Sequence, residues 1–179
     1  REKALEKTKI SVLDIGFGTG LNAFMTYLEA EKYKFEIDYV AIEAYPISGE
    51  TAAALNFAKV LNKSDMALHF MKFHDCDWDC PIDFSGNFRF EKKQCLFQEI
   101  DFKNRFDVIY FDAFAPSAQP ELWEEPVMKR MYEALNPKGI LVTYCAKGAV
   151  KRTLKGLGFT VEGIKGPPGK REMTRAFKQ

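Results

Sequence analysis

Short apolar runs alternate with helical patterns along most of this 179-residue chain. Several of the apolar runs lack polar residues, which is typical of strands buried on both faces. They predict strands over residues 10–13, 37–42, 95–100, 106–111 and 140–144. Apolar residues at helical spacing predict helices over residues 21–33, 47–61, 121–135 and 149–157. Repeated β–α alternation predicts an α/β fold, a mostly parallel sheet with helices on both faces.

Three further segments complete the expected organisation. Asn136-Pro137-Lys138-Gly139 predicts a stop between a helix and the next strand. The runs 159–164 and 171–178 flank a Gly-Pro-Pro-Gly sequence and predict a C-terminal antiparallel hairpin. Residues 62–93 are the least regular and exceed a normal connection, so we expect an inserted lid or small helical patch there. The length fits one domain over residues 1–179.

Composition excludes several classes of protein. The chain is 46% apolar and 14% aromatic, which argues against disorder. No apolar run approaches the ~20 residues needed to cross a bilayer, and the charged start is not a signal peptide, so we expect no membrane association. Four scattered cysteines favour a reducing compartment over a disulfide framework, and therefore a cytoplasmic location.

Charge is unevenly distributed along the chain. The net charge is +1, but residues 145–179 carry nine Lys or Arg against two acids, which gives +7 and leaves −6 on residues 1–144. A basic end on an acidic chain is typical of a protein that meets a polyanion, although a solvated helix face gives the same pattern.

A glycine-rich loop joins the first predicted strand to the first helix. It consists of Asp14, Ile15, Gly16, Phe17, Gly18, Thr19 and Gly20. Glycines let a ligand approach the backbone, and the helix start offers free N–H groups. The dinucleotide fingerprint places a glycine at position 21, where this chain has Leu, and no P-loop is present. The Asp14 carboxylate would repel a pyrophosphate but could orient the ammonium of an amino-acid-like ligand. The loop therefore favours S-adenosylmethionine over NAD.

Acidic residues near the ends of the next two predicted strands complete a nucleoside site. Glu43 ends the second strand, where a carboxylate can accept both ribose hydroxyls. Glu99 lies near the end of the third predicted strand and is expected to meet the adenine amino group, with Asp101 as the alternative.

The fourth predicted strand ends in Asp112, followed by Ala-Phe-Ala-Pro. Ligands of open α/β sheets bind at the carboxyl ends of strands, so Asp112 is expected at the reacting centre, where it would also contact the cofactor. Phe114 and Pro116 would wall a slot for a planar group. An aspartate that opens a loop is also common as a simple turn residue.

These motifs resemble a known family. Asp14–Gly20, the Asp112–Pro116 run, residues 120–123, residues 144–148 and the basic ending at 166–173 are similar to the methyltransferase domain of the tRNA 5-methylaminomethyl-2-thiouridine biosynthesis proteins. The resemblance implies a class I methyltransferase that uses S-adenosylmethionine. Its substrate would be the exocyclic primary amine of 5-aminomethyl-(2-thio)uridine at tRNA wobble position 34.

The resemblance also implies a division of labour. Many members carry an FAD-dependent oxidoreductase domain and a segment upstream of the glycine loop, for which this chain shows no counterpart, so a separate enzyme would supply the aminomethyl group. Asp112 would take a proton from the amine or orient it. Phosphate contacts are expected from Lys147, Lys151, Arg152, Lys170 and Arg171.

The sequence leaves two alternative functions open and does not favour a metal site. His69, His74, Cys76 and Cys80 lie within twelve residues, but their spacing does not match a zinc site, so no metal is expected. The protein could instead methylate a small-molecule amine or another nucleoside. It could also be a catalytically silent subunit that binds S-adenosylmethionine.

Overall fold

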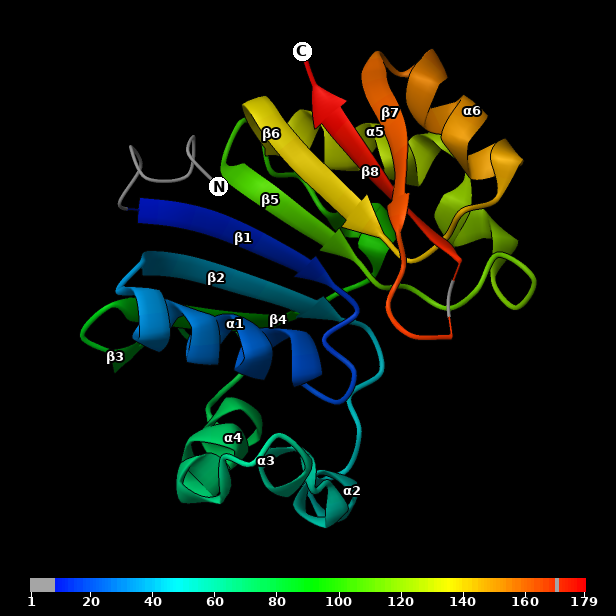
Figure 1. Ribbon diagram of the computed structural model, residues 1–179. Coiled ribbons are helices and arrows are strands. Elements are labelled where there is room, and N and C mark those ends of the chain that lie inside the picture. Colours follow the sequence, from blue (N-terminus) through cyan, green and yellow to red (C-terminus); the bar gives the residue numbers. More distant parts are fainter. Residues whose placement is uncertain (1–8, 170) are drawn as a thin grey trace.

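The computed structural model describes residues 9–169 and 171–179, and one twisted sheet organises them (Figure 1). The strand order is β3-β4-β2-β1-β5-β6-β8-β7. The strands are β1 (Lys9–Ile15), β2 (Glu36–Glu43), β3 (Ile82–Ser85), β4 (Phe88–Gln94), β5 (Phe106–Phe111), β6 (Leu135–Thr143), β7 (Phe159–Lys165) and β8 (Glu172–Lys178). Neighbours from β4 to β6 pair in parallel, and β8 pairs antiparallel with both β6 and β7. The predicted parallel sheet and C-terminal antiparallel hairpin are therefore confirmed.

Helices cover both faces of the sheet (Figure 1). The α-helices are α1 (Leu21–Tyr33), α2 (Gly49–Ala54), α3 (Phe57–Val60), α4 (Ala67–Asp75), α5 (Glu125–Ala134) and α6 (Gly148–Gly156). The 3-10 helices are η2 (Ser64–Met66), η3 (Phe97–Glu99) and η4 (Pro120–Trp123). Figure 1 shows α1 on one face, with α4 beyond it, and α5 and α6 on the opposite face. Each face has its own apolar core, one built on α1 and α4 and the other on α5 and α6.

The third parallel strand is β4, so the prediction of a strand at residues 95–100 is wrong. That segment contains η3 instead. In β4, aromatic and charged residues alternate as Phe-Arg-Phe-Glu-Lys-Lys-Gln, and the polar residues concealed the strand. Residues 62–93 therefore hold two strands of the sheet in addition to the expected helix α4.

Aromatic side chains anchor this segment in the core. Phe73 of α4 is fully buried, stacks on Phe84 with ring centroids 4.0 Å apart, and meets Phe90 at 4.9 Å. Tyr27 of α1 packs against the same cluster, 5.0 Å from Phe84. Residues 62–93 thus supply five of the fifteen buried residues in the core on this face.

Three other predicted elements differ from the structure in their boundaries, because the local backbone geometry interrupts them. The expected helix over 47–61 is divided into α2 and α3, and Ser48 caps α2 by accepting the Thr51 N–H at 3.1 Å. The expected helix over 121–135 is divided into η4 and α5. The predicted stop at 136–139 lies inside β6, where the pairing with β5 shifts register and Lys138 has a φ of 65°. The turn residues therefore make an irregularity within a strand.

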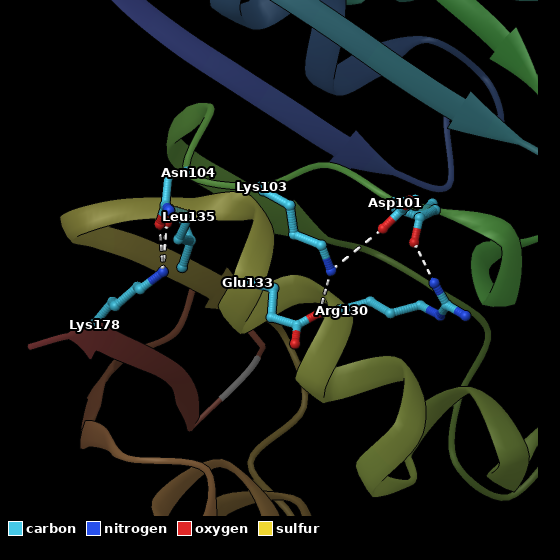
Figure 2. A network of polar contacts seen from close by, with 8 residues as sticks. Asp101, Lys103, Asn104, Arg130, Glu133, Leu135 and Lys178 are labelled. Atoms are coloured by element: carbon cyan, nitrogen blue, oxygen red, sulfur yellow. Dashed lines mark hydrogen bonds and ion pairs between the residues drawn. The ribbon is translucent and has the colours of Figure 1, made fainter.

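Polar contacts connect the segment between β4 and β5 to α5 and to β8 (Figure 2). Lys103 pairs with Glu133 of α5 at 2.6 Å, and Arg130 of α5 donates to the Ile100 carbonyl at 2.7 Å. Lys178 of β8 donates to Asn104 at 3.0 Å. These bonds fix the segment that carries η3 beside the carboxyl ends of the strands.

The buried aromatic cluster makes a prediction about stability. Phe73→Ala removes a fully buried ring and should lower the free energy of unfolding by about 3–5 kcal/mol. Leu68→Ala on the same helix is the matched control, because that side chain is 84% exposed and should change stability by less than about 0.5 kcal/mol. Urea denaturation measures both. Equal effects of the two changes would contradict a core role for α4.

Candidate active site

A cavity of about 650 Å³ opens at the carboxyl ends of β1, β2, β5 and β6. It lies where the strand order reverses between β1 and β5, the position at which open α/β sheets bind ligands. The side chains and backbone that line it come from five segments: 16–22, 43–45, 96–98, 112–122 and Tyr144.

The glycine loop forms the floor of this cavity between β2 and β5. Gly16 has a φ of 93°, and a Cβ there would lie 2.9 Å from the Asp112 carbonyl oxygen, so only glycine fits. The N–H groups of Gly16 and Phe17 donate to the Ile42 carbonyl at 3.0 Å. Gly16, Phe17, Gly18 and Thr19 line the cavity as expected. Gly20 packs outside it, against Phe17 and His74.

Glu43 stands at the wall of the cavity, at the end of β2. Its carboxylate accepts the Gly18 N–H and the Tyr45 N–H, each at 2.9 Å. Each oxygen keeps a further lone pair for a ligand hydroxyl. The location is the one expected for a residue that binds the ribose diol.

Asp14 lies beneath the cavity and is fully buried. It accepts the Tyr39 hydroxyl at 2.8 Å and the Asn22 side-chain amide at 3.2 Å. Burial raises the pKa of Asp14 from the ordinary 3.8 to about 7, although both hydrogen bonds oppose the shift. Asp14 does not line the cavity, so its link to a ligand runs through Asn22, which does.

Asp112 lies at the exposed side of the cavity, directly after β5. Its N–H donates to the Ile15 carbonyl at 2.9 Å, and its carboxylate accepts the Asn22 amide at 3.3 Å. Phe114 lines the cavity with its ring 69% exposed, and the Trp123 indole donates to its carbonyl at 2.7 Å. Pro116 is outside the lining.

Glu99 is not where the sequence placed it. It ends η3, not a strand, and its carboxylate accepts the Leu96 N–H at 2.9 Å, which caps that short helix. Gln98 lines the cavity in its stead. The alternative, Asp101, pairs with Lys103 at 3.2 Å and is outside the lining (Figure 2).

Sequence reasoning missed several cavity residues. Tyr45, Leu96, Gln98, Glu121 and Tyr144 all line it. Each lies within about nine residues of a strand end, and this proximity is the one sequence signal that could have found them.

The charged side chains that line the cavity have one sign. The charged residues among the described lining are Glu43, Asp112 and Glu121, and all three are acids. Such a lining attracts a cation.

The basic candidates lie outside the cavity. Lys147 and Arg152 are exposed at the start and middle of α6, and Arg171 is exposed just before β8. Lys151 is half-buried and pairs with Glu172 at 2.9 Å. Lys170 lies outside the described residues. Since β6 and β7 end, and β8 begins, at the same edge of the sheet as β1 and β5, the basic residues stand near the cavity mouth.

The histidine and cysteine cluster of the sequence has a packing role. His74 of α4 lies 5.2 Å from the Phe17 ring, and its Nε2 is 3.2 Å from the Thr19 carbonyl oxygen. Burial lowers the pKa of His74. Within residues 9–169 and 171–179, no group of three or more His, Cys, Asp or Glu is arranged to hold a metal ion. In the same part of the chain, no helix has the length and apolarity to cross a membrane.

Comparison with known proteins identifies the family. Residues 89–179 match the model of the S-adenosyl-L-methionine-dependent methyltransferases. The chain belongs to this family. The expected methyltransferase fold and the expected cofactor are thereby confirmed, and the site fits that cofactor. Its glycine loop leaves room where side chains would stand, and its acids suit a sulfonium and an ammonium.

Individual relatives cover the methyltransferase almost completely. The tRNA 5-methylaminomethyl-2-thiouridine biosynthesis bifunctional protein MnmC of Campylobacter hominis is 30% identical over 96% of this chain and 26% of its own length. The protein of the same name from a Marinomonas species is 28% identical over 97% of this chain and 27% of its own. The methyltransferase thus spans about a quarter of the length of these curated relatives.

Solved structures share the fold. MnmC2 from Aquifex aeolicus has a TM-score of 0.69 at 24% identity, and the match covers 98% of this chain and 55% of that chain. The 1,6-didemethyltoxoflavin-N1-methyltransferase of Burkholderia thailandensis, solved with S-adenosylhomocysteine, has a TM-score of 0.56 at 16% identity, covering 99% and 74%.

The buried carboxyl of Asp14 makes a prediction about pH. Its folded-state pKa of about 7 exceeds the ordinary value, so the protonated form stabilises the fold below about pH 4, and this contribution is lost as pH rises through 7. Asp14→Asn removes the effect. The difference in the free energy of unfolding, variant minus parent, should increase by up to about 1.4 kcal/mol per pH unit between about pH 4 and pH 7.

Urea denaturation at several pH values measures this difference. Asp83→Asn, on the exposed side of β3, controls for the loss of one negative charge. A difference that stays constant with pH would mean that Asp14 is ionised at no cost in the folded protein.

Proposed function

We propose that this methyltransferase acts on tRNA. It would methylate the exocyclic primary amine of 5-aminomethyl-(2-thio)uridine at wobble position 34, giving 5-methylaminomethyl-(2-thio)uridine. The observation that carries the proposal is the charge pattern: the described charged residues in the cavity are acids, and exposed basic residues of α6 and of the segment before β8 follow strand ends at the same edge of the sheet. A cationic amine suits the first and a polyanion suits the second. The printed names of the relatives point to the same tRNA nucleoside.

Asp112 is the residue we assign to the chemistry. Bound S-adenosylmethionine supplies a methyl carbon activated by positive sulfur. The new N–C bond forms as the C–S bond breaks, so the amine must be unprotonated and in line. Asp112 can accept hydrogen bonds from the amine and take its proton, or orient it while water does so. Phe114, exposed at the rim, would lie against the uracil ring.

The remaining residues would hold the cofactor. Glu43 binds the ribose hydroxyls, and the backbone of Gly16–Thr19 lies along the nucleoside. Gln98 occupies the place for which the sequence suggested Glu99, and its side-chain amide can both donate to and accept from adenine. Asp14 and Gly20 lie outside the cavity and would not contact the cofactor directly.

A tRNA substrate also has consequences for phosphate contacts, for the source of the aminomethyl group and for the cellular location. Lys147, Arg152 and Arg171 would contact tRNA phosphates, whereas Lys151 would first have to leave Glu172. The aminomethyl group must come from another catalytic unit, either a separate enzyme or a further part of a longer protein. We place the reaction in the cytoplasm, and four free cysteines support this location.

Replacement of Asp112 tests the proposed chemistry. Asp112→Asn should slow single-turnover methylation by at least about 10²-fold, because it removes a positioned acid–base group. Cofactor affinity should change little. The assay combines labelled S-adenosylmethionine with tRNA that lacks the final methyl group, followed by nucleoside analysis. Asp101→Asn, an exposed carboxyl outside the cavity, should keep the parental rate.

Two results would contradict these assignments. Parental rates for Asp112→Asn across the pH range would remove Asp112 from the mechanism. Tight cofactor binding without any methylation of tRNA would instead favour a small-molecule amine or another nucleoside as substrate.

Salt dependence tests the tRNA surface. The triple change Lys147→Ala, Arg152→Ala, Arg171→Ala should weaken tRNA binding and flatten the slope of log affinity against log salt. Each lost phosphate contact accounts for about 0.7–0.9 of that slope. Lys59→Ala with Lys63→Ala, exposed lysines at α3 and beside it, is the matched control. Equal slopes for the triple variant and the parent would place the tRNA elsewhere.

A further inference from the structure

Asn22 lies in the first turn of α1 between two carboxylates that come from different strands. Its Nδ2 is 3.2 Å from Asp14 Oδ1 and 3.3 Å from Asp112 Oδ2. A side-chain amide carries two N–H groups, so one hydrogen is available for each aspartate. The reverse orientation would direct the amide oxygen at two carboxylates, and like charges oppose it.

We propose that Asn22 is a positioning residue of the methyltransferase, whose amide holds the Asp112 carboxylate at the cavity and couples it to Asp14 beneath. The role given to Asp112 rests on the proposed function. The coupling itself rests only on the cofactor site and its hydrogen bonds.

The hydrogen bonds of Asp14 explain how the coupling works. Ionised Asp14 can accept from both of its neighbours, the Asn22 amide and the Tyr39 hydroxyl. A proton on Oδ1 makes that oxygen a donor and weakens it as an acceptor for the amide N–H. Asn22 then binds it best by turning its own oxygen toward Asp14, and in that orientation Asp112 loses its donor. The state of the buried aspartate thereby changes the orientation of the carboxylate at the surface of the cavity.

The surroundings place this change near neutral pH. Burial is the main cause that raises the pKa of Asp14, to about 7, and the negative charges of Asp112 and Glu43 raise it further. Tyr39 of β2 and Tyr110 of β5 also face Asp14, and burial raises the pKa of each hydroxyl, so both stay neutral in this range. Asn22 itself does not titrate, so it transmits the change without adding a charge.

The coupling can be measured without any tRNA. In protein labelled with ¹³C at aspartate carboxyls, the Asp112 signal of the parent should show an inflection at the midpoint of Asp14, near pH 7. Asn22→Leu keeps the bulk of the side chain but removes both donors. It should weaken that inflection to what the direct charge effect between the two aspartates leaves, and move the Asp14 midpoint upward, because a hydrogen bond to the ionised form is lost. Asp14→Asn and Asp112→Asn assign the two signals.

Kinetics test the positioning role. Asn22→Leu should lower the single-turnover rate about 10-fold or more, since a misplaced reacting group is costly. Asn22→Gln retains the amide and should recover part of the rate and of the inflection. Glu29→Gln, two turns along α1, contacts neither aspartate and is the control for a change in that helix.

The outcomes separate this proposal from the proposed function. A weaker Asp112 inflection in Asn22→Leu supports the coupling even if tRNA is not the substrate. An unchanged inflection in Asn22→Leu overturns it, as does a variant that loses stability while both midpoints stay in place. If Asn22→Leu does not fold, the same comparison of Asp112 signals is made with Asn22→Ala, which also removes both donors, and an inflection equal to the parent's then overturns the coupling.

Discussion

The close approach of Gly16 to the carbonyl of Asp112 brings the ends of β1 and β5 together. A side chain at residue 16 would collide with that carbonyl, and the positive φ of the loop already demands glycine. Because the two strands meet without a side chain between them, the loop can turn beneath the cavity while Asp112 faces it from the other side. This contact therefore determines where the glycine loop lies beneath the cavity. It also fixes where Asn22 can bond both Asp14 and Asp112.

Acidic and basic side chains lie on different elements around the cavity. The carboxylates lie at the end of β2, directly after β5 and on η4, whereas the exposed cations lie at α6 and before β8. A ligand that carries both phosphates and an amine suits this arrangement. The basic residues would attract its phosphates, and the acidic cavity would attract its amine. It also explains why the net charge of +1 carries so little information.

The sequence predicted best where one physical cause acted alone. Local rules predict the glycine loop between a strand and a helix, the carboxylate after β5 and the C-terminal hairpin, and the structure has all three. The strand β4 was missed because its residue 92 is a lysine that is almost fully buried. Tertiary contacts compensate for that burial: the ammonium donates to the His74 carbonyl at 2.5 Å and lies 4.6 Å from the centre of the Trp78 ring. Glu99 misled because a carboxylate that caps a short helix has the same sequence signature as one that binds a ligand.

The position of β8 between β6 and β7 has a consequence for biosynthesis. The ribosome delivers β7 before β8, yet among residues 9–169 and 171–179 the sole neighbour of β7 in the sheet is β8. During translation β7 must therefore wait, with both of its edges unpaired, until residues 172–178 have left the exit tunnel. The half of the sheet from β3 to β5 needs no such delay, since all its strands emerge earlier. Nascent chains should thus pass through a stage in which the glycine loop and Asp112 are already assembled while the basic edge is still missing, and a chaperone that shields unpaired strand edges would act at that stage.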